Sequence, residues 1–182
     1  MSNIIGILGK KNSGKTTVYE MLHGILSENE TIVKLSFAGK LKEMLSVLTG
    51  IKKEHLNNPD TKNILFKNKL IRVWLQSLGE WGRNMIPDLW IDTTLTNLNP
   101  NNVYIIDDVR FKNEVEKIKQ LGGMIIKINR PSLKSNDTHI SETEMDSILN
   151  YDEFIINDGG LQDLYKKVKS IAKKYYNLEK TF

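Results

Sequence analysis

The sequence predicts a three-layer α/β/α fold around a mostly parallel five-stranded sheet. One observation is a set of short apolar runs, rich in β-branched residues and bounded by Gly, Asn, Asp or Pro, which are typical of buried strands. They cover Ile4–Leu8, Ile32–Phe37, Val103–Ile106, Met124–Ile128 and Phe154–Ile156. The other is the helical spacing of the stretches between them, Lys15–Leu26, Leu41–Leu48, Asn68–Leu78, Asn113–Leu121 and Leu161–Tyr176. Apolar strands that alternate with helices indicate a parallel sheet covered on both faces.

The composition is that of an ordinary globular protein. The chain has 182 residues, of which 40% are hydrophobic and 26% charged, so we expect one domain, 1–182. It has no cysteine, which excludes disulfides and thiolate metal sites. The net charge of +4 is spread along the chain, so no specific nucleic-acid partner is expected. The first apolar run breaks after Leu8 and is too short for a signal peptide or a membrane span. We therefore expect no membrane partner and a cytoplasmic location, in the host if the protein is viral.

Two regions depart from the strand–helix alternation. The stretch of about 50–100 holds helical pieces without an obvious strand. We interpret it as a helical insertion over the site rather than a separate domain. The stretch of about 130–150 has the composition of a mobile loop, and its place after the fourth strand makes it the candidate lid. Ligands of such sheets bind beyond the carboxyl ends of the strands, so the polar residues after each strand are the candidate site.

The strongest local signal follows the first strand. The segment Gly9–Thr16 reads GKKNSGKT and matches the phosphate-binding pattern G-x-x-x-x-G-K-[ST], with a strand before it and a helix after it. Its glycines allow backbone N–H groups to curl around an anion, at the positive end of the helix dipole. Lys15 is expected to reach the outer phosphates and Thr16 to join a magnesium shell. The expected phosphate contacts are Gly9, Lys11, Asn12, Ser13, Gly14, Lys15, Thr16 and Thr17.

The third strand ends in two adjacent carboxylates, Asp107 and Asp108, followed by Arg110. A carboxylate at this place is the expected second magnesium ligand. Successive strand side chains point to opposite faces, so the residues alone do not decide between the two Asp. Arg110 could bridge donor and acceptor phosphates; the alternative is a surface salt bridge to Glu114 one turn on.

The chain resembles the bacteriophage deoxynucleoside monophosphate kinases, within the P-loop kinases. Besides the phosphate loop, ordered short blocks carry the resemblance: Leu35–Ala38 with Leu41 and Lys42, Leu75–Gly79 with Trp81–Arg83, Asp108–Phe111 with Asn113 and Glu114, Leu121–Gly123, Arg130–Pro131, Asp137–Glu142, and Asn157–Gly159 with Leu161 and Leu164. The resemblance implies a kinase fold with a lid and a monophosphate-binding insertion. It also implies transfer of the ATP γ-phosphoryl group, with Mg²⁺, to a deoxynucleoside monophosphate. Catalytic roles would fall to Lys15, Arg110 and Asp108. Asp107 departs from the family, where a smaller or neutral residue is more usual.

Further residues are assigned to the two substrates. The acceptor would meet Ser36, Phe37, Lys42, Arg72, Gln76, Trp81 and Arg83. Arg72 and Gln76 are four apart and share a helix face, whereas Ser36 could equally be a helix N-cap and Trp81 a core residue. ATP would meet Arg130 in the lid and the turn with Asn157 and Gly159, whose backbone would lie against adenine; a plain connection is the alternative.

Three alternatives stay open. One is a P-loop kinase for another small phosphorylated acceptor, such as dephospho-coenzyme A. The others, from a different class, are a P-loop NTPase switch and a nucleic-acid-stimulated ATPase. The sequence does not determine the oligomeric state, and a homodimer is compatible with it.

Overall fold

The computed structural model describes residues 3–58, 60–133 and 140–176, without the side chains of 140–143. The chain forms two compact units. One combines Met1–Leu35 with Leu98–Phe182, and the other is Ser36–Asn97. We describe each unit by itself.

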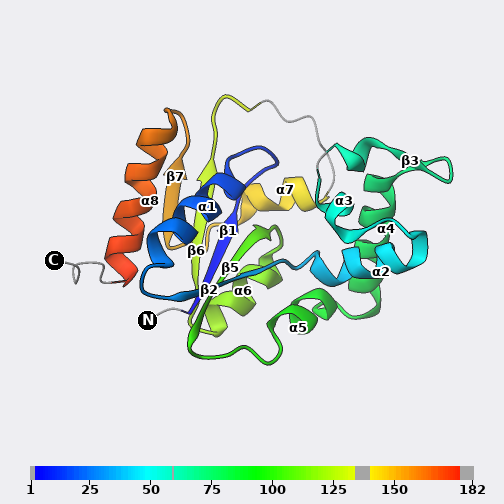
Figure 1. The fold of residues 1–182 in the computed structure, drawn as a ribbon, viewed down its shortest axis with the longest axis horizontal. Helices are drawn as coiled ribbons and strands as arrows, with labels where there is room; N and C mark the ends of the chain where they lie inside the picture. Colours follow the sequence, from blue (N-terminus) through cyan, green and yellow to red (C-terminus); the bar gives the residue numbers. More distant parts are fainter. Residues whose placement is uncertain (1–2, 59, 134–139, 177–182) are drawn as a thin grey trace. The chain divides into compact units, whose positions relative to one another are not determined.

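The first unit is built on a five-stranded sheet in the order β2-β5-β1-β6-β7, with every pair of neighbours parallel (Figure 1). The strands are β1 Ile4–Leu8, β2 Thr31–Leu35, β5 Asn102–Val109, β6 Met124–Asn129 and β7 Glu153–Ile156. The predicted five-stranded parallel sheet is confirmed. The first strand lies at its centre, so the phosphate loop that follows β1 has neighbouring strand ends on both sides.

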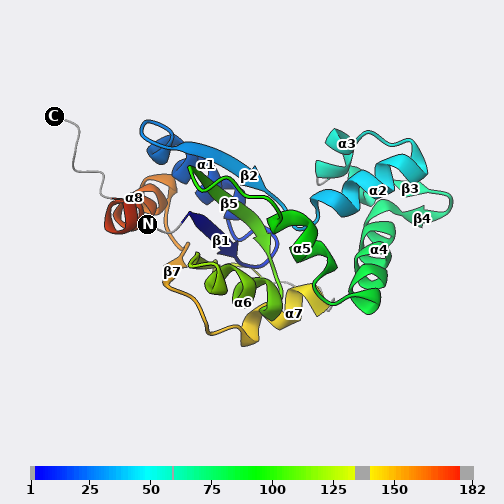
Figure 2. The same ribbon diagram turned by 90° about the horizontal axis from the view of Figure 1, so that it is seen from below.

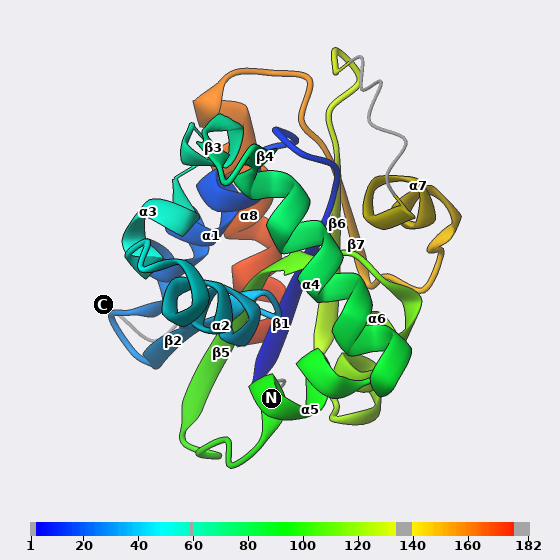
Figure 3. The same ribbon diagram turned by 90° about the vertical axis from the view of Figure 1, so that its right-hand side faces the viewer.

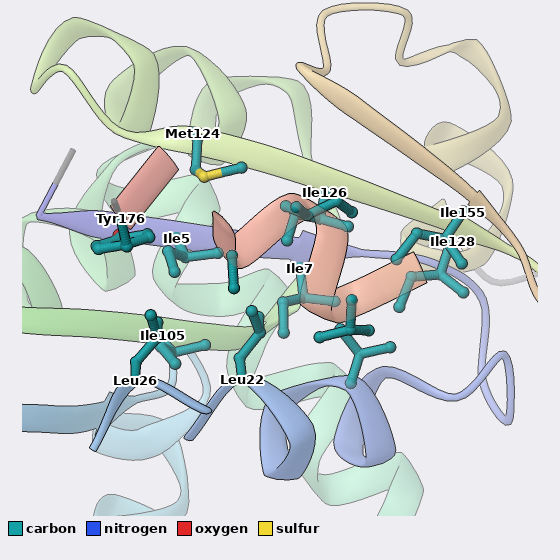
Figure 4. Packing of buried hydrophobic residues seen from close by; sticks show 14 of the residues in the cluster. Ile5, Ile7, Leu22, Leu26, Ile105, Met124, Ile126, Ile128, Ile155 and Tyr176 are labelled. Atoms are coloured by element: carbon teal, nitrogen blue, oxygen red, sulfur yellow. The ribbon is translucent and has the colours of Figure 1, made fainter. Parts of the chain in front are cut away.

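Helices cover both faces of this sheet (Figure 2). α1 Lys15–Leu26 and α8 Leu161–Tyr176 lie on one face, and α6 Lys112–Gln120 lies on the other, where Ile118 packs over Gly6. The core between the sheet and the two helices α1 and α8 is almost entirely aliphatic (Figure 4). It includes Ile5, Ile7, Leu22, Leu26, Ile105, Met124, Ile126, Ile128, Ile155 and Tyr176. α7 Ile140–Ser147 precedes β7.

Two strand ends differ from the prediction. β2 ends at Leu35 rather than Phe37, because the Gly39 N–H bonds to the Ser36 carbonyl and closes a turn there. β5 runs on past Ile106 to Val109, so both aspartates are inside the strand. Between two register pairs, β1 advances by two residues (Gly6 to Leu8) while β5 advances by three (Ile106 to Val109). The extra residue is a β-bulge at Asp107 and Asp108, a feature that re-aims side chains.

The second unit is mainly helical (Figure 3). Its elements are α2 Gly39–Thr49, α3 Lys53–Asn57, a 3₁₀ turn at Thr61–Asn63, the hairpin β3 Leu65–Phe66 and β4 Lys69–Leu70, α4 Ile71–Met85 and α5 Leu89–Leu95. Leu45, Leu56 and Ile71 form the centre of its core. The unit begins at Ser36, not near residue 50, because α2 packs on α3 and α4.

Two details of this unit correct the sequence-based expectation. The predicted helix Asn68–Leu78 starts at Ile71 and continues to Met85. Lys67 and Asn68 have φ of 49° and 63° and form the hairpin turn, so a short strand pair occupies a region where none was obvious.

Of the expected lid, 130–150, the residues 134–139 lie outside the described part of the chain. Among the described helices, none has the length and apolar character needed to cross a bilayer.

Candidate active site

The phosphate loop is shaped by two glycines. Gly14 has φ of 107°, a backbone conformation that residues with a Cβ rarely adopt, and it is the residue before α1. At Gly9, a Cβ would lie 2.7 Å from the backbone oxygen of Ile128. The loop closes through a hydrogen bond from the Ser13 N–H to the Lys10 carbonyl, at 3.1 Å. Only glycine fits both places, as the motif requires.

The polar groups of the loop surround the start of α1. The Lys15 ammonium donates to the backbone carbonyls of Gly9 and Lys10, so it is folded into the loop. Ser13 is buried, and its hydroxyl oxygen has no hydrogen-bond partner among the described residues. Thr16, Lys11 and Asn12 are exposed, and Thr17 is half-buried. The loop therefore offers a cationic group and exposed polar groups at a helix N-terminus, which suits a phosphate.

Asn157 braces the loop from the far strand. Its side-chain amide donates to the Ser13 carbonyl at 2.9 Å, and its backbone N–H donates to the Asn129 carbonyl at the end of β6. The residue thus connects β7 and β6 to the phosphate loop. Gly159, in the same turn, is exposed.

Lys34 pairs with the first of the two aspartates. The Lys34 ammonium lies 2.7 Å from the Asp107 carboxylate, whose side chain is 13% exposed, and 4.1 Å from the centre of the Tyr19 ring. Lys34 is in β2, Asp107 in β5 and Tyr19 in α1. The charge of Asp107 is therefore balanced by a neighbour from another strand.

Asp108 lies near the end of β5, and Arg110 lies in the turn that leads from β5 into α6. Glu114, in the first turn of α6, accepts hydrogen bonds from the backbone N–H of Arg110 at 2.7 Å and of Phe111 at 3.1 Å. Burial raises the pKa of Glu114 to about 8; the two N–H donors oppose this rise and the negative charge of Asp108 adds to it. Glu114 is only 6% exposed, so it is not the surface partner of Arg110 considered above, although the positive charge of Arg110 also opposes the rise of its pKa.

The sheet brings the predicted nucleotide residues to one edge. In the parallel register Leu8 faces Val109 on one side and Lys127 on the other, while Asn129 faces Ile156. The phosphate loop, Arg110, the exposed Arg130 and Asn157 therefore all follow neighbouring strand ends, and Asp108 is the last residue but one of β5. This is the edge at which such sheets bind ligands.

The expected acceptor residues all belong to the other unit, Ser36–Asn97. Those on α4 lie on two opposite faces of that helix. With about 3.6 residues per turn, Arg72, Gln76 and Arg83 share one face of α4, whereas Trp81 points to the opposite side. The Arg83 guanidinium lies over Gly79, within 3.6 Å of where a Cβ would stand. The Arg72 guanidinium donates to the side-chain oxygen of Asn63 at 3.3 Å.

Trp81 lines an apolar groove of about 860 Å³. The groove runs between α2, α4 and α5, and its wall includes Met44, Val47, Leu89 and Trp90. Trp81 is 49% exposed, so it is available for a contact, whereas Trp90 is a core residue, 5% exposed. The polar face of α4 and the groove are two separate surfaces of this unit.

The remaining acceptor candidates differ in exposure. Phe37 is buried, at 3% exposed, so its side chain is part of a core. Lys42 donates to the side-chain oxygen of Asn57 at 2.9 Å. The residue before α2 is Ala38, so Ser36 is not its N-cap.

Three roles were not found from the sequence. They are the ion pair of Lys34 with Asp107, the hydrogen bond from Asn157 to Ser13, and the burial of the Glu114 side chain against the Arg110 and Phe111 N–H groups. The first two join residues far apart in the chain, and no local signal marks them. The third had a signal, a Glu three residues after Phe111 at a helix start, which is where an acid bonds back to the turn.

A strand, a phosphate loop, a helix and an acidic strand end, with helices on both faces of a parallel sheet, define a P-loop nucleotide-binding fold. The fold agrees with the structure of dephospho-CoA kinase from Campylobacter jejuni, which is 15% identical over 94% of this chain and 96% of that one, with a TM-score of 0.50. The sequence comparisons identify the family more closely than the fold does. The family model described as deoxynucleotide monophosphate kinase matches residues 52–168. The chain belongs to this deoxynucleotide monophosphate kinase family.

Two viral relatives support the assignment. A protein of Acanthamoeba polyphaga mimivirus, provisionally named a deoxynucleotide monophosphate kinase, is 32% identical over 92% of this chain and 94% of its own length. The deoxynucleotide monophosphate kinase of Enterobacteria phage T4 is 40% identical over 70 residues, which are 38% of this chain and 29% of that enzyme.

Proposed function

We propose that the protein transfers the γ-phosphoryl group of ATP to the phosphate of a deoxynucleoside monophosphate. The observation that carries this proposal is the common edge formed by the phosphate loop and the Asp108–Arg110 turn. An oxygen of the acceptor phosphate attacks the γ-phosphorus, and the bond from that phosphorus to the bridging oxygen of ADP breaks. The products are ADP and a deoxynucleoside diphosphate. The acceptor oxygen is already anionic, so the reaction needs positioning and charge neutralisation rather than a general base.

The residues of the loop and the turn suit these tasks. The Lys15 ammonium, now on two loop carbonyls, would exchange them for phosphate oxygens, and Arg110 would hold donor and acceptor phosphates by paired hydrogen bonds. The hydroxyl of Thr16 and a carboxylate at the end of β5 are hard oxygen ligands of the kind that Mg²⁺ prefers. When bound, Mg²⁺ would neutralise charge on the phosphates. We assign Asp108 rather than Asp107 to this role, because Lys34 already balances Asp107.

The acceptor is assigned to the polar face of α4. Arg72 and Arg83 supply the positive charge that a monophosphate needs, and Gln76 between them can donate to or accept from a base. Arg130 and the turn at Asn157 and Gly159 remain our assignment for ATP. The viral relatives favour the host cytoplasm as the place of action, and a homodimer stays a prediction that light scattering would test.

The alternative acceptor, dephospho-coenzyme A, is supported only by a shared fold. The test is an ADP-release assay with Mg²⁺ and ATP against the four deoxynucleoside monophosphates, their ribose forms and dephospho-coenzyme A. We expect ADP release that depends on a deoxynucleotide, is lost in Lys15→Ala and is retained in Lys166→Ala, which removes an exposed lysine of α8. Release with dephospho-coenzyme A alone would replace the proposal by the alternative. Stimulation by nucleic acid alone would point to an ATPase.

A further inference from the structure

Glu114 is unusual among the described residues. Aromatic residues aside, Glu114 and Ser13 are the only buried polar side chains in the described part of the chain, and Glu114 is the only buried carboxyl group there. Burying a carboxyl group is costly unless hydrogen bonds compensate for the lost water. Its neighbours in the chain, Phe111 and Val115, are buried too. A buried acid at this place therefore calls for an explanation that an exposed helix residue would not need.

The hydrogen bonds of Glu114 provide it. One carboxyl oxygen, Oε2, accepts from two consecutive backbone N–H groups, those of Arg110 and Phe111, at 2.7 and 3.1 Å. These two residues form the step between the end of β5 at Val109 and the start of α6 at Lys112. The residue before α6 is Phe111, which has no polar side chain to cap the helix. The acceptor for the two N–H groups of this step is instead Glu114, a buried side chain of the first turn of the same helix.

The same turn carries the charged groups that we assign to phosphoryl transfer. Fixing the N–H of Arg110 and of Phe111 fixes the backbone on both sides of the Arg110 Cα, and hence the direction in which its side chain leaves the turn. Asp108 lies two residues before Arg110, on the β-bulge. Catalytic groups need such support, because a misplacement of about 1 Å can cost about a hundredfold in rate.

We propose that Glu114 is a positioning residue that holds the turn of Arg110 and Asp108 in the geometry needed for phosphoryl transfer. It touches no substrate and acts through the backbone of Arg110. The proposal rests on the proposed function for its kinetic consequence, but the hydrogen bonds can be tested without it.

The test compares three variants of the whole protein. Glu114→Gln keeps a side-chain oxygen that can accept the two N–H groups, and Glu114→Ala removes it. Val115→Ala is the matched control, because it removes buried atoms from the neighbouring position of α6 without touching the turn. We expect Glu114→Ala to lower kcat about tenfold or more with the KM for ATP changed by less than about threefold, and Glu114→Gln to restore most of kcat. Val115→Ala should lower the Tm with little change in kcat.

Amide hydrogen exchange supplies the second measurement. The N–H groups of Arg110 and Phe111 should exchange about tenfold faster or more in Glu114→Ala than in the wild type, and remain protected in Glu114→Gln. This result is expected whether or not the wild type phosphorylates a deoxynucleotide, so it separates the two proposals. If Glu114→Ala does not fold, Glu114→Asp, one methylene shorter, should show the same losses in weaker form.

Two outcomes would overturn the role of Glu114. One is equal exchange of the two amides in all variants. The other is a kcat, per folded molecule, that falls no more in Glu114→Ala than in Val115→Ala, which would leave Glu114 a helix-stabilising residue only.

Discussion

The side-chain amide of Asn157 donates a hydrogen bond of 2.9 Å to the backbone carbonyl of Ser13. The two residues come from opposite ends of the chain, and the bond joins the end of β7 to the centre of the phosphate loop. The Asn157 amide nitrogen would also lie 2.6 Å from a Cβ placed on Gly14. The side chain of Asn157 therefore holds the loop at Ser13, and Gly14 leaves the room for it.

We predict that Asn157→Ala weakens phosphate binding rather than base recognition. Loss of one hydrogen bond of this kind corresponds to about 1 kcal/mol, so the Kd for ATP should rise about fivefold. The Kd for inorganic tripolyphosphate, which has no base, should rise by the same factor. Calorimetric titration of both ligands measures this. Asp158→Ala, an exposed neighbour in the same turn, is the control and should leave both affinities unchanged. A loss confined to ATP would instead assign Asn157 to the adenine.

Two glycines of the same region should respond in opposite ways to alanine. At Gly14, φ of 107° and the closeness of Asn157 make a Cβ unfavourable, so Gly14→Ala should destabilise the fold by about 1–3 kcal/mol and weaken ATP binding. Gly24 is an exposed position inside α1 with nothing within 4 Å of an added Cβ. Gly24→Ala should therefore stabilise the protein, by about 0.5–1 kcal/mol. Urea unfolding of the two variants compares them directly; equal effects would mean that the loop conformation tolerates a side chain.

The two aspartates of β5 should differ in their importance. If Asp108 serves the phosphates while Lys34 balances Asp107, Asp108→Asn should lower kcat about a hundredfold or more, and Asp107→Asn less than about tenfold. Each change removes one charge and keeps the shape, so the pair is its own matched control. Steady-state kinetics at several Mg²⁺ concentrations makes the comparison, and only Asp108→Asn should need more Mg²⁺ for half-maximal rate. The reverse order would assign the role to Asp107.

The sequence predicted the sheet well because its strands and first helix have strong local patterns. β1 and α1 have the predicted bounds, since a run of Ile and Leu interrupted only by Gly6 and the glycines of the loop mark both. The hairpin, with two residues in each strand, and the five residues of α3 are too short to produce a periodic pattern. The helix that includes Arg72 and Gln76 was predicted, but its extension to Met85 was not. The place of Trp81 relative to Arg83 could be found only once that extension was known.

The residues of the candidate site likewise divide into those that local sequence patterns predict and those that they do not. The phosphate loop is one continuous segment, so its residues could be predicted from spacing alone. Lys34 and Asp107 are brought together by the strand order β2-β5, which spacing does not give. The burial of Glu114 likewise depends on how α6 packs on the sheet. Sequence reasoning missed the residues whose roles depend on how segments far apart in the chain pack together.

Glu114 also predicts a pH dependence of stability. Burial raises its pKa from an ordinary value of 4.5 to about 8, with Asp108 adding to the rise and the N–H groups of Arg110 and Phe111 opposing it. The folded protein therefore keeps a proton at Glu114 between these two pH values, while the unfolded chain releases it. Because the folded state binds more protons in this window, its stability falls as the pH rises, by up to about 1.4 kcal/mol per pH unit for this group. Below the window the carboxyl group is protonated in both states, and above it the loss is complete.

Glu114→Gln is the control, because its side chain resembles the neutral acid and does not titrate. Urea unfolding of both proteins from pH 5 to pH 9 should show the wild type losing stability relative to Glu114→Gln with rising pH, and the difference levelling off above about pH 8. All other titrating groups are shared, so they cancel in the difference. If the two curves ran parallel over this range, the carboxyl group would have the same pKa folded and unfolded. The N–H groups of Arg110 and Phe111 and the positive charge of Arg110 would then balance the cost of burial and the negative charge of Asp108.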